Sequence, residues 1–95
     1  MSDLKYSVLF TNKFKRDYKN MIKRGLDIAL LDEVITKLAK GETLEKKYRD
    51  HYLTGDLAGF RECHIKPDWL LIYKIENEKV VLTLTRTGSH SDLFE

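Results

Sequence analysis

The sequence predicts one α+β domain in which a helical hairpin packs on one face of an antiparallel-rich sheet, in the order β-α-α-β-β-β. Apolar residues recur at helical spacing between residues 12 and 41, whereas strand-like alternation and apolar runs dominate after residue 59. A chain of 95 residues can bury one modest core but not two, and no internal repeat or linker divides it. We therefore expect residues 1–95 to form a single domain.

The first elements are a short strand and a basic helix. Residues 6–10 read as the strand, and Thr11 or Asn12 is suited to cap the following helix. A short side-chain oxygen at that position accepts an N–H that the first helical turn leaves unpaired. Apolar residues then recur at helical spacing with lysines and arginines between them, and Gly25 is expected to end the helix.

A second helix is expected between Asp27, as its cap, and a stop at Gly41. Its apolar residues form one stripe, made of Leu30, Leu31, Val34, Ile35 and Leu38. Two helices joined by so short a turn must form an antiparallel hairpin, which can bury its apolar side against the sheet.

Three strands are expected in the second half, over residues 59–66, 69–76 and 79–86. Alternation in the first of them places Cys63 and His64 on opposite faces. Pro67 interrupts the ladder, and the apolar run that follows is typical of a strand buried on both faces. Residues 77–78 suit a hairpin turn, and residues 87–88 are expected to break the last strand.

The stretch over residues 42–58 has no clean period and is long for a connection inside a compact domain. Such loops often carry function. Its charged residues are Lys46, Lys47, Arg49, Asp50 and His51, among others. The last residues, 89–95, are expected to be loosely held, with Leu93 as an anchor and Phe94 free.

Charge is distributed unevenly although the formal net charge is only +2. Residues 1–50 carry 12 Lys and Arg against 8 Asp and Glu, whereas residues 51–95 carry 5 against 7. The excess on the first helix is made of Lys13, Lys15, Arg16, Lys19, Lys23 and Arg24. This surface could meet a polyanion or an acidic protein, or it could be a solvated helix face.

Composition indicates a soluble cytoplasmic protein, with 42% apolar and 34% charged residues. No apolar run approaches the roughly 20 residues that span a bilayer, and the N-terminus lacks the order of a signal peptide. The lone Cys63 cannot form an internal disulfide and reads as a small buried hydrophobe in a reducing compartment.

The candidates for chemistry are three histidines, His51, His64 and His90, with Glu62 on the strand of His64 and Arg86 at the end of the last strand. The sequence has no C-x-x-C, no H-E-x-x-H, no nucleophile elbow and no phosphate-binding glycine loop, so neither a metal nor a cofactor is expected. General acid–base chemistry remains. Cleavage of RNA by its own 2′-hydroxyl needs a base, an acid and a cation, and no metal.

Two aromatic side chains could stack on unpaired bases, Trp69 and Phe94. The alternative for Trp69 is a place in the core, because it begins a strand.

Three motifs with their spacing resemble a known family: residues 48–55 (YRDHYLTG), 61–73 (RECHIKPDWLLIY) and 86–94 (RTGSHSDLF). The resemblance is to the YafQ branch of the RelE-like toxins of bacterial type II toxin–antitoxin systems, and it runs over nearly the whole chain. One departure is Tyr52, where members of the branch commonly have proline.

The resemblance implies a RelE-like fold and a metal-independent endoribonuclease that cuts mRNA on the translating 70S ribosome. A cognate antitoxin would wrap around the toxin and silence it, so the chain would be a monomer or part of a toxin–antitoxin hetero-oligomer. The basic first helix would face ribosomal RNA or an acidic antitoxin segment.

The resemblance also implies site residues. The acid–base set would be His51, His64, Asp68 and His90. Arg86 would stabilise the phosphate and Glu62 would take part. Trp69 and Phe94 would position the mRNA or stack on it. The charge pattern, and not the resemblance, adds basic residues to the expected RNA-binding set: Arg61, Lys46, Lys47 and Arg49. Which histidine is the acid and which the base stays open.

Two other functions compete with this hypothesis. One is an inactive homologue that binds RNA or an antitoxin, and the other is a structural subunit without a nucleic-acid role. A pure binder has no need of three imidazoles, so the histidines favour the enzyme.

Overall fold

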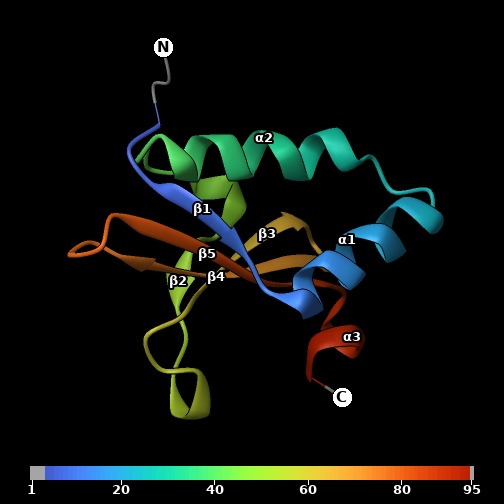
Figure 1. Cartoon of the computed structure of the whole chain (residues 1–95). Helices are drawn as coiled ribbons and strands as arrows, with labels where there is room; N and C mark the ends of the chain where they lie inside the picture. Colours follow the sequence, from blue (N-terminus) through green and yellow to red (C-terminus); the bar gives the residue numbers. More distant parts are fainter. Residues whose placement is uncertain (1–3, 95) are drawn as a thin grey trace.

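The structure is a computed structural model, and it describes residues 4–94. Within these residues five strands form one sheet in the order β1-β5-β4-β3-β2 (Figure 1). Their bounds are Ser7–Phe10 for β1, His51–Tyr52 for β2, Arg61–Lys66 for β3, Trp69–Glu76 for β4 and Val81–Gly88 for β5. β1 pairs parallel with β5 and every other pair is antiparallel, so the predicted α+β fold class is confirmed.

Both predicted helices begin and end at the expected signals. α1 (Asn12–Lys23) is capped by Thr11, whose hydroxyl oxygen accepts the Phe14 N–H at 3.0 Å. α2 (Ile28–Ala39) is capped by Asp27, whose carboxylate accepts the Ala29 N–H at 3.2 Å. Gly25 ends α1 with φ of 81°, a left-handed conformation that glycine adopts without a steric cost.

The two helices have different places on the sheet (Figure 1). α2 covers one face, whereas α1 follows β1 and lies along the edge of β5 where β1 ends. The Asp17 carboxylate in α1 accepts the Thr87 N–H of β5 at 3.1 Å. This side chain therefore satisfies a strand-edge donor that β1 is too short to reach.

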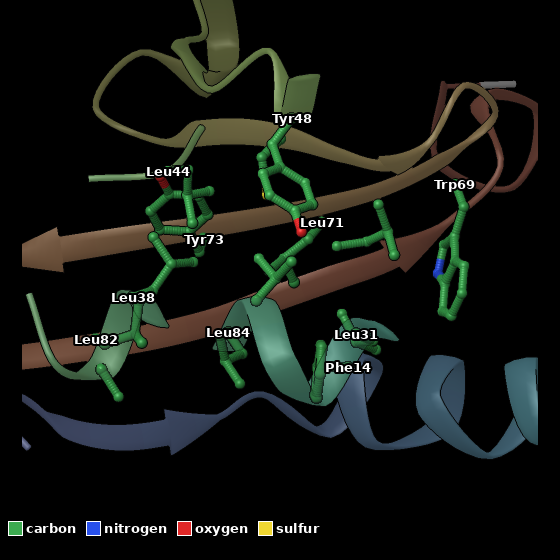
Figure 2. Close-up of a cluster of buried hydrophobic side chains, with 14 of the residues drawn as sticks. Phe14, Leu31, Leu38, Leu44, Tyr48, Trp69, Leu71, Tyr73, Leu82 and Leu84 are labelled. Carbon is green, nitrogen blue, oxygen red and sulfur yellow. The ribbon is translucent and has the colours of Figure 1, made fainter. Parts of the chain in front are cut away.

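The hydrophobic core lies between α2 and the sheet (Figure 2). Leu31 and Val34 of α2 are fully buried against Leu71, Tyr73 and Leu84 of the central strands. Truncating a side chain such as Leu31 to alanine would cost about 2–5 kcal/mol of stability.

The opposite face of the sheet carries the polar residues that matter for function. Paired residues of an antiparallel ladder point to the same face. His64 pairs with Leu70, and Glu62 pairs with Ile72, which in turn pairs with Arg86. Leu70 and Ile72 are buried but lie outside the core cluster, so this set faces away from α2. Cys63 points into the core, as predicted.

A β-bulge determines where Arg86 points. The register shifts so that Ile72 pairs with Arg86 while Tyr73 pairs with Leu84, which leaves Thr85 as the extra residue. Without the bulge, Arg86 would share the core face of Leu84, because strand side chains alternate. The bulge moves the guanidinium to the face of Glu62 and His64.

Three expectations about boundaries are wrong. Residues 42–58 contain two short 3₁₀ turns, η1 (Lys46–Tyr48) and η2 (Gly55–Leu57), with β2 between them. β5 continues to Gly88, because its ladder with β4 still pairs Thr87 with Leu71 and Gly88 with Leu70. The end of the chain forms a helix, α3 (His90–Phe94), on the side of the sheet away from α2 (Figure 1).

Among the described residues, no helix combines the length and the apolar character needed to cross a membrane.

Candidate active site

Three imidazole rings form a row on the sheet face opposite α2, here called the histidine row. The rings of His51 in β2 and His64 in β3 have centroids 6.3 Å apart, and His64 and the ring of His90 in α3 are 5.9 Å apart. Phe94 continues the row, with its ring 6.5 Å from that of His90. The structure thus brings together residues that lie up to 43 positions apart in the chain.

Glu62 lies between the first two histidines. Its Oε1 is 3.4 Å from His51 Nε2 and 3.7 Å from His64 Nε2. The ladder explains the placement, because His51 pairs directly with Glu62 and His64 follows two residues later on the same face. The Glu62 side chain is only 8% exposed, so its charge is available mainly to the two imidazoles.

Hydrogen bonds at Nδ1 determine which nitrogen faces the site. His51 Nδ1 lies 2.6 Å from the Arg49 carbonyl oxygen, and His64 Nδ1 lies 3.3 Å from the Pro67 carbonyl oxygen. A carbonyl oxygen only accepts hydrogen bonds, so Nδ1 of each ring must be the donor. Nε2 is therefore the atom that each ring presents to Glu62 and to the space beside it.

Asp68 holds His90. Its Oδ1 accepts the backbone N–H of His90 at 2.9 Å and lies 2.6 Å from His90 Nδ1. The backbone hydrogen bond, followed by the bond to the ring, lowers the pKa of the Asp68 carboxyl. The Asp68 carboxylate thus orients the His90 ring and joins the β3–β4 turn to α3.

The end of the chain is tied down more firmly than expected. The Asp92 carboxylate accepts two hydrogen bonds from the Arg24 guanidinium, at 2.7 and 2.9 Å, and one from the Ser89 N–H at 2.8 Å. The Arg24 guanidinium, and next the Ser89 N–H, hold the pKa of Asp92 well below its usual range. Leu93 is half-buried and Phe94 is 47% exposed.

Arg86 reaches the histidine face but is not free. Its Nε lies 2.7 Å from Asp17 Oδ2 and its Nη2 lies 3.1 Å from Asp17 Oδ1. Asp17 is absent from the residues predicted from the sequence, although a signal exists: it is the one acidic residue among residues 4–26, and it shares a helical stripe with Phe14 and Met21. A carboxylate on a buried stripe needs a partner, and here the partner is Arg86.

Two residues expected to bind RNA are corrected. Trp69 is 3% exposed and its indole N–H donates to the Thr87 hydroxyl at 3.0 Å, so it is a core residue that cannot stack on a base. The Arg61 guanidinium bonds to Asp50 and Tyr73 on the core side of the sheet, which raises its pKa, and it is not available to a phosphate.

The other predicted cations remain at the surface. Lys47 and Arg49, with Lys66, line a groove of about 420 Å³ that also includes His64. Lys46 is exposed beside them. The basic residues of α1 are exposed too, except that Arg24 is committed to Asp92 and is corrected from a free surface cation to a contact that holds α3.

No group of three or more His, Cys, Asp or Glu side chains within residues 4–94 is placed to hold a metal ion. Burial raises the pKa of the Cys63 thiol, which points away from the histidines and keeps its proton.

Comparison with known proteins assigns the chain to a family. A family model described as the bacterial toxin of the type II toxin–antitoxin system, YafQ, matches residues 6–95. The chain belongs to the YafQ toxin family. It is 37% identical over 93 residues to the mRNA interferase toxin YafQ of Escherichia coli (strain K12), a match that spans 97% of this chain and 95% of that relative.

Solved structures of the YafQ family agree with the fold. The toxin in the crystal structure of the E. coli DinJ-YafQ toxin-antitoxin complex matches with a TM-score of 0.89 and 33% identity, over 97% of this chain and 100% of that one. A metal-bound toxin from Helicobacter pylori matches with a TM-score of 0.88 and 46% identity, over 94% and 99% of the two chains. The resemblance in the three sequence motifs is thereby confirmed at the level of the family.

Proposed function

We propose that this YafQ family member is an mRNA endoribonuclease that cuts mRNA on the ribosome by metal-independent acid–base chemistry and so stops translation and growth. The observation that carries the chemistry is the histidine row, in which two imidazoles present Nε2 around one buried carboxylate and a third stands beside them. The related E. coli toxin is named an mRNA interferase, which supports the choice of substrate.

The proposed reaction is an attack by the RNA on itself. One imidazole takes the proton of the 2′-hydroxyl, and the oxygen so activated bonds to the adjacent phosphorus. The bond from phosphorus to the 5′ oxygen breaks, and a protonated imidazole on the other side gives that oxygen its proton. The products are a 2′,3′-cyclic phosphate and a 5′-hydroxyl. Neighbouring ring centroids are only about 6 Å apart, so the phosphate would lie beside the rings of the row and not between them.

Two carboxylates support the imidazoles of the histidine row, whichever of these rings acts as acid or base. Glu62 stabilises positive charge on His51 and His64 when either ring is protonated, because its carboxylate is close to both Nε2 atoms. Asp68 does the same for His90 and fixes the orientation of its ring. The metal-independent mechanism rests on these groups supplying the base, the acid and the positive charge themselves.

Charge on the pentacoordinate phosphorus would be offset by Arg86. Asp17 orients its guanidinium through Nε and Nη2, and Nη1 takes no part in that pair. Lys13 and Arg16 lie beside it in a groove of about 270 Å³, so the region stays cationic although Asp17 neutralises one charge.

RNA would approach along surfaces at both sides of the row. Phe94, exposed at its end, can stack on an unpaired base. Lys46, Lys47, Arg49 and Lys66 can contact phosphates on the His64 side. The exposed cations of α1 would meet ribosomal RNA or an acidic segment of a cognate antitoxin, as the DinJ-YafQ complex suggests by analogy.

We place the protein in the cytoplasm, because its proposed substrate is mRNA on the ribosome.

The deciding experiment is cleavage of mRNA on purified translating ribosomes, with the chemistry of both new ends determined. We expect a 2′,3′-cyclic or 3′-phosphate end and a 5′-hydroxyl, and no effect of EDTA at concentrations that leave ribosomes intact. A 5′-phosphate product, or cleavage that EDTA abolishes, would contradict the mechanism. Binding to ribosomes or to the antitoxin without cleavage would instead identify the inactive homologue.

A further inference from the structure

The strand that carries His51 has little to hold it in place. β2 is two residues long, lies at the edge of the sheet, and both of its side chains are exposed. Beyond its two ladder pairs, the Leu53 N–H donates to the Phe60 carbonyl oxygen at 2.9 Å. A short edge strand of this kind normally frays, so the position of the His51 ring needs another source of order.

One side chain, Arg61, contacts the residues on both sides of His51. Its Nη2 lies 2.8 Å from Asp50 Oδ2, and its Nε lies 3.3 Å from Asp50 Oδ1. The same guanidinium lies over the ring of Tyr52, with Cζ 4.1 Å from the ring centroid. Arg61 also pairs with Tyr52 in the β2–β3 ladder, so the backbone contact and the side-chain contact reinforce each other.

Tyr73 connects this group to the core. Its hydroxyl donates to the Asp50 carboxylate and lies 3.2 Å from Arg61 Nε, and its side chain is fully buried. Burial, and then the hydrogen bond to Asp50, raises the pKa of Tyr73, so the hydroxyl keeps the proton that it donates. Asp50 and Arg61 are themselves only 19% and 23% exposed, which makes their ion pair less accessible to solvent than a surface pair.

The backbone before His51 transmits this order to its ring. Arg49 has φ of 50° and ψ of 42°, a left-handed conformation that residues other than glycine adopt rarely and only when their surroundings impose it. This conformation directs the Arg49 carbonyl oxygen to His51 Nδ1, at 2.6 Å. Asp50, which Arg61 and Tyr73 hold in place, lies between Arg49 and His51 in the chain.

We propose that Arg61 is a positioning residue for His51, acting with Asp50, Tyr52 and Tyr73 as a clamp. The clamp holds the loop so that Arg49 fixes the Nδ1–H tautomer and Nε2 faces Glu62. The inference rests on the proposed function, because it assigns His51 a role in RNA cleavage. It replaces the expected role of Arg61 as an RNA-binding residue.

The first test is a double-mutant cycle with Arg61→Lys and His51→Ala. Lysine keeps the positive charge but cannot donate from two nitrogens to one carboxylate or stack as a planar group. We expect Arg61→Lys to lower kcat about 10- to 100-fold, as is typical when a supporting residue of an active site is lost. KM should change by less than about twofold, because binding of mRNA is not affected. In a His51→Ala background, Arg61→Lys should cause no further decrease.

The second test observes the ring directly, with Tyr73→Phe and the matched control Tyr6→Phe. Tyr6 is also buried and lines the same cavity as the clamp, but its hydroxyl donates to Asn77, at 2.9 Å, and not to a clamp residue. Imidazole ¹⁵N shifts should report the Nδ1–H tautomer of His51 in the unchanged protein and in Tyr6→Phe. In Tyr73→Phe they should move for His51 and stay constant for His64 and His90.

Two results would overturn the clamp. One is a loss of rate from Arg61→Lys that persists in the His51→Ala background, and the other is a raised KM with unchanged kcat, which would return Arg61 to RNA binding. If Arg61→Lys does not fold, Tyr73→Phe enters the same cycle. A protein that never cleaves RNA would refute the proposed function, while the imidazole shifts would still decide whether the clamp sets the His51 ring.

Discussion

The two ends of the histidine row are held in place by different kinds of contact. At one end, His51 depends on Asp50 and Arg61, which are mostly buried and bonded to the core residue Tyr73. At the other end, His90 is bonded to Asp68, and the two side chains are 55% and 69% exposed. The His51 end is therefore connected to the folding core, whereas the His90 end is assembled from contacts at the surface.

This difference separates stability from activity along one site. α3 carries His90 and Phe94. Its Asp92 forms an ion pair with Arg24, whose side chain is 49% exposed to solvent. Exposed ion pairs contribute little to stability and weaken with salt. Changes at the His90 end should consequently alter cleavage without unfolding the domain, whereas changes at the His51 end should affect both.

The largest expected effect is that of His90→Ala. Removing a general acid or base costs about 10²- to 10⁴-fold in rate. The thermal melting temperature should stay nearly constant, because an exposed side chain seldom contributes more than about 0.5 kcal/mol. Ribosome-dependent cleavage and a thermal melt are measured together, with His64→Ala for comparison at the centre of the row.

Asp68→Asn is the control for this variant, because it keeps an oxygen acceptor for His90 but removes the negative charge. We expect an intermediate loss of rate. If the melting temperature of His90→Ala fell in step with its activity, the distinction between the two ends would be wrong and His90 would be a structural residue.

A smaller effect is expected from Phe94→Ala. Loss of stacking on one base costs about 1–3 kcal/mol, or roughly 5- to 150-fold in cleavage. Phe94→Tyr should keep most of the activity, because the ring is retained. Leu9→Ala is the control, since Leu9 is 54% exposed on β1, away from the histidine row. Equal losses in the two alanine variants would show that Phe94 acts only as an exposed apolar residue.

Smaller again is the effect of charge on α1. Replacing Lys15 and Lys19 by glutamine should weaken association with ribosomes and make its dependence on salt shallower. The logarithmic slope should change by about 0.7–0.9 for each phosphate that the protein no longer neutralises. The rate of the bound complex should not change. The control replaces Lys40 and Lys79 by glutamine, which removes the same charge from exposed positions elsewhere. If both double variants changed the salt dependence of ribosome binding equally, the basic residues of α1 would be only a solvated surface.

The sequence contains enough local information for the helices and for one face of the sheet. The caps at Thr11 and Asp27 and the opposite directions of Cys63 and His64 follow from short-range rules, and the structure confirms them. Arg86 could not be placed in this way, because the bulge at Thr85 reverses the face that simple alternation gives it.

Hydrogen-bond partners that are distant in the chain could not be predicted from the sequence either. The sequence predicts that Arg61 and Trp69 bind RNA, but their hydrogen-bond partners, Asp50 and Thr87, lie 11 and 18 positions away. No periodicity relates a residue of an irregular loop to a strand it will contact. The family resemblance brought the three histidines into one site, while their geometry needed the structure.

The smallest effect concerns acid, and it acts at the His90 end. The pKa of Asp92 is lower in the folded protein than its ordinary value of about 3.9, because Arg24 and the Ser89 N–H stabilise the carboxylate. A carboxyl with a lowered pKa stabilises the folded state above its unfolded pKa and loses that contribution as the pH falls through the folded value. The contact that holds α3 should thus be complete at pH 5 and weaken steadily below about pH 4. Amide hydrogen exchange of α3, corrected for the intrinsic effect of pH, should increase by about 2- to 5-fold over this range, as fits an exposed ion pair.

The control is Asp92→Asn, in which exchange of the α3 amides should already be fast at pH 5 and should not increase further as the pH falls. An equal response of the amides of β2 would show that acid loosens the whole domain, and the two ends of the row would then not differ in the way proposed.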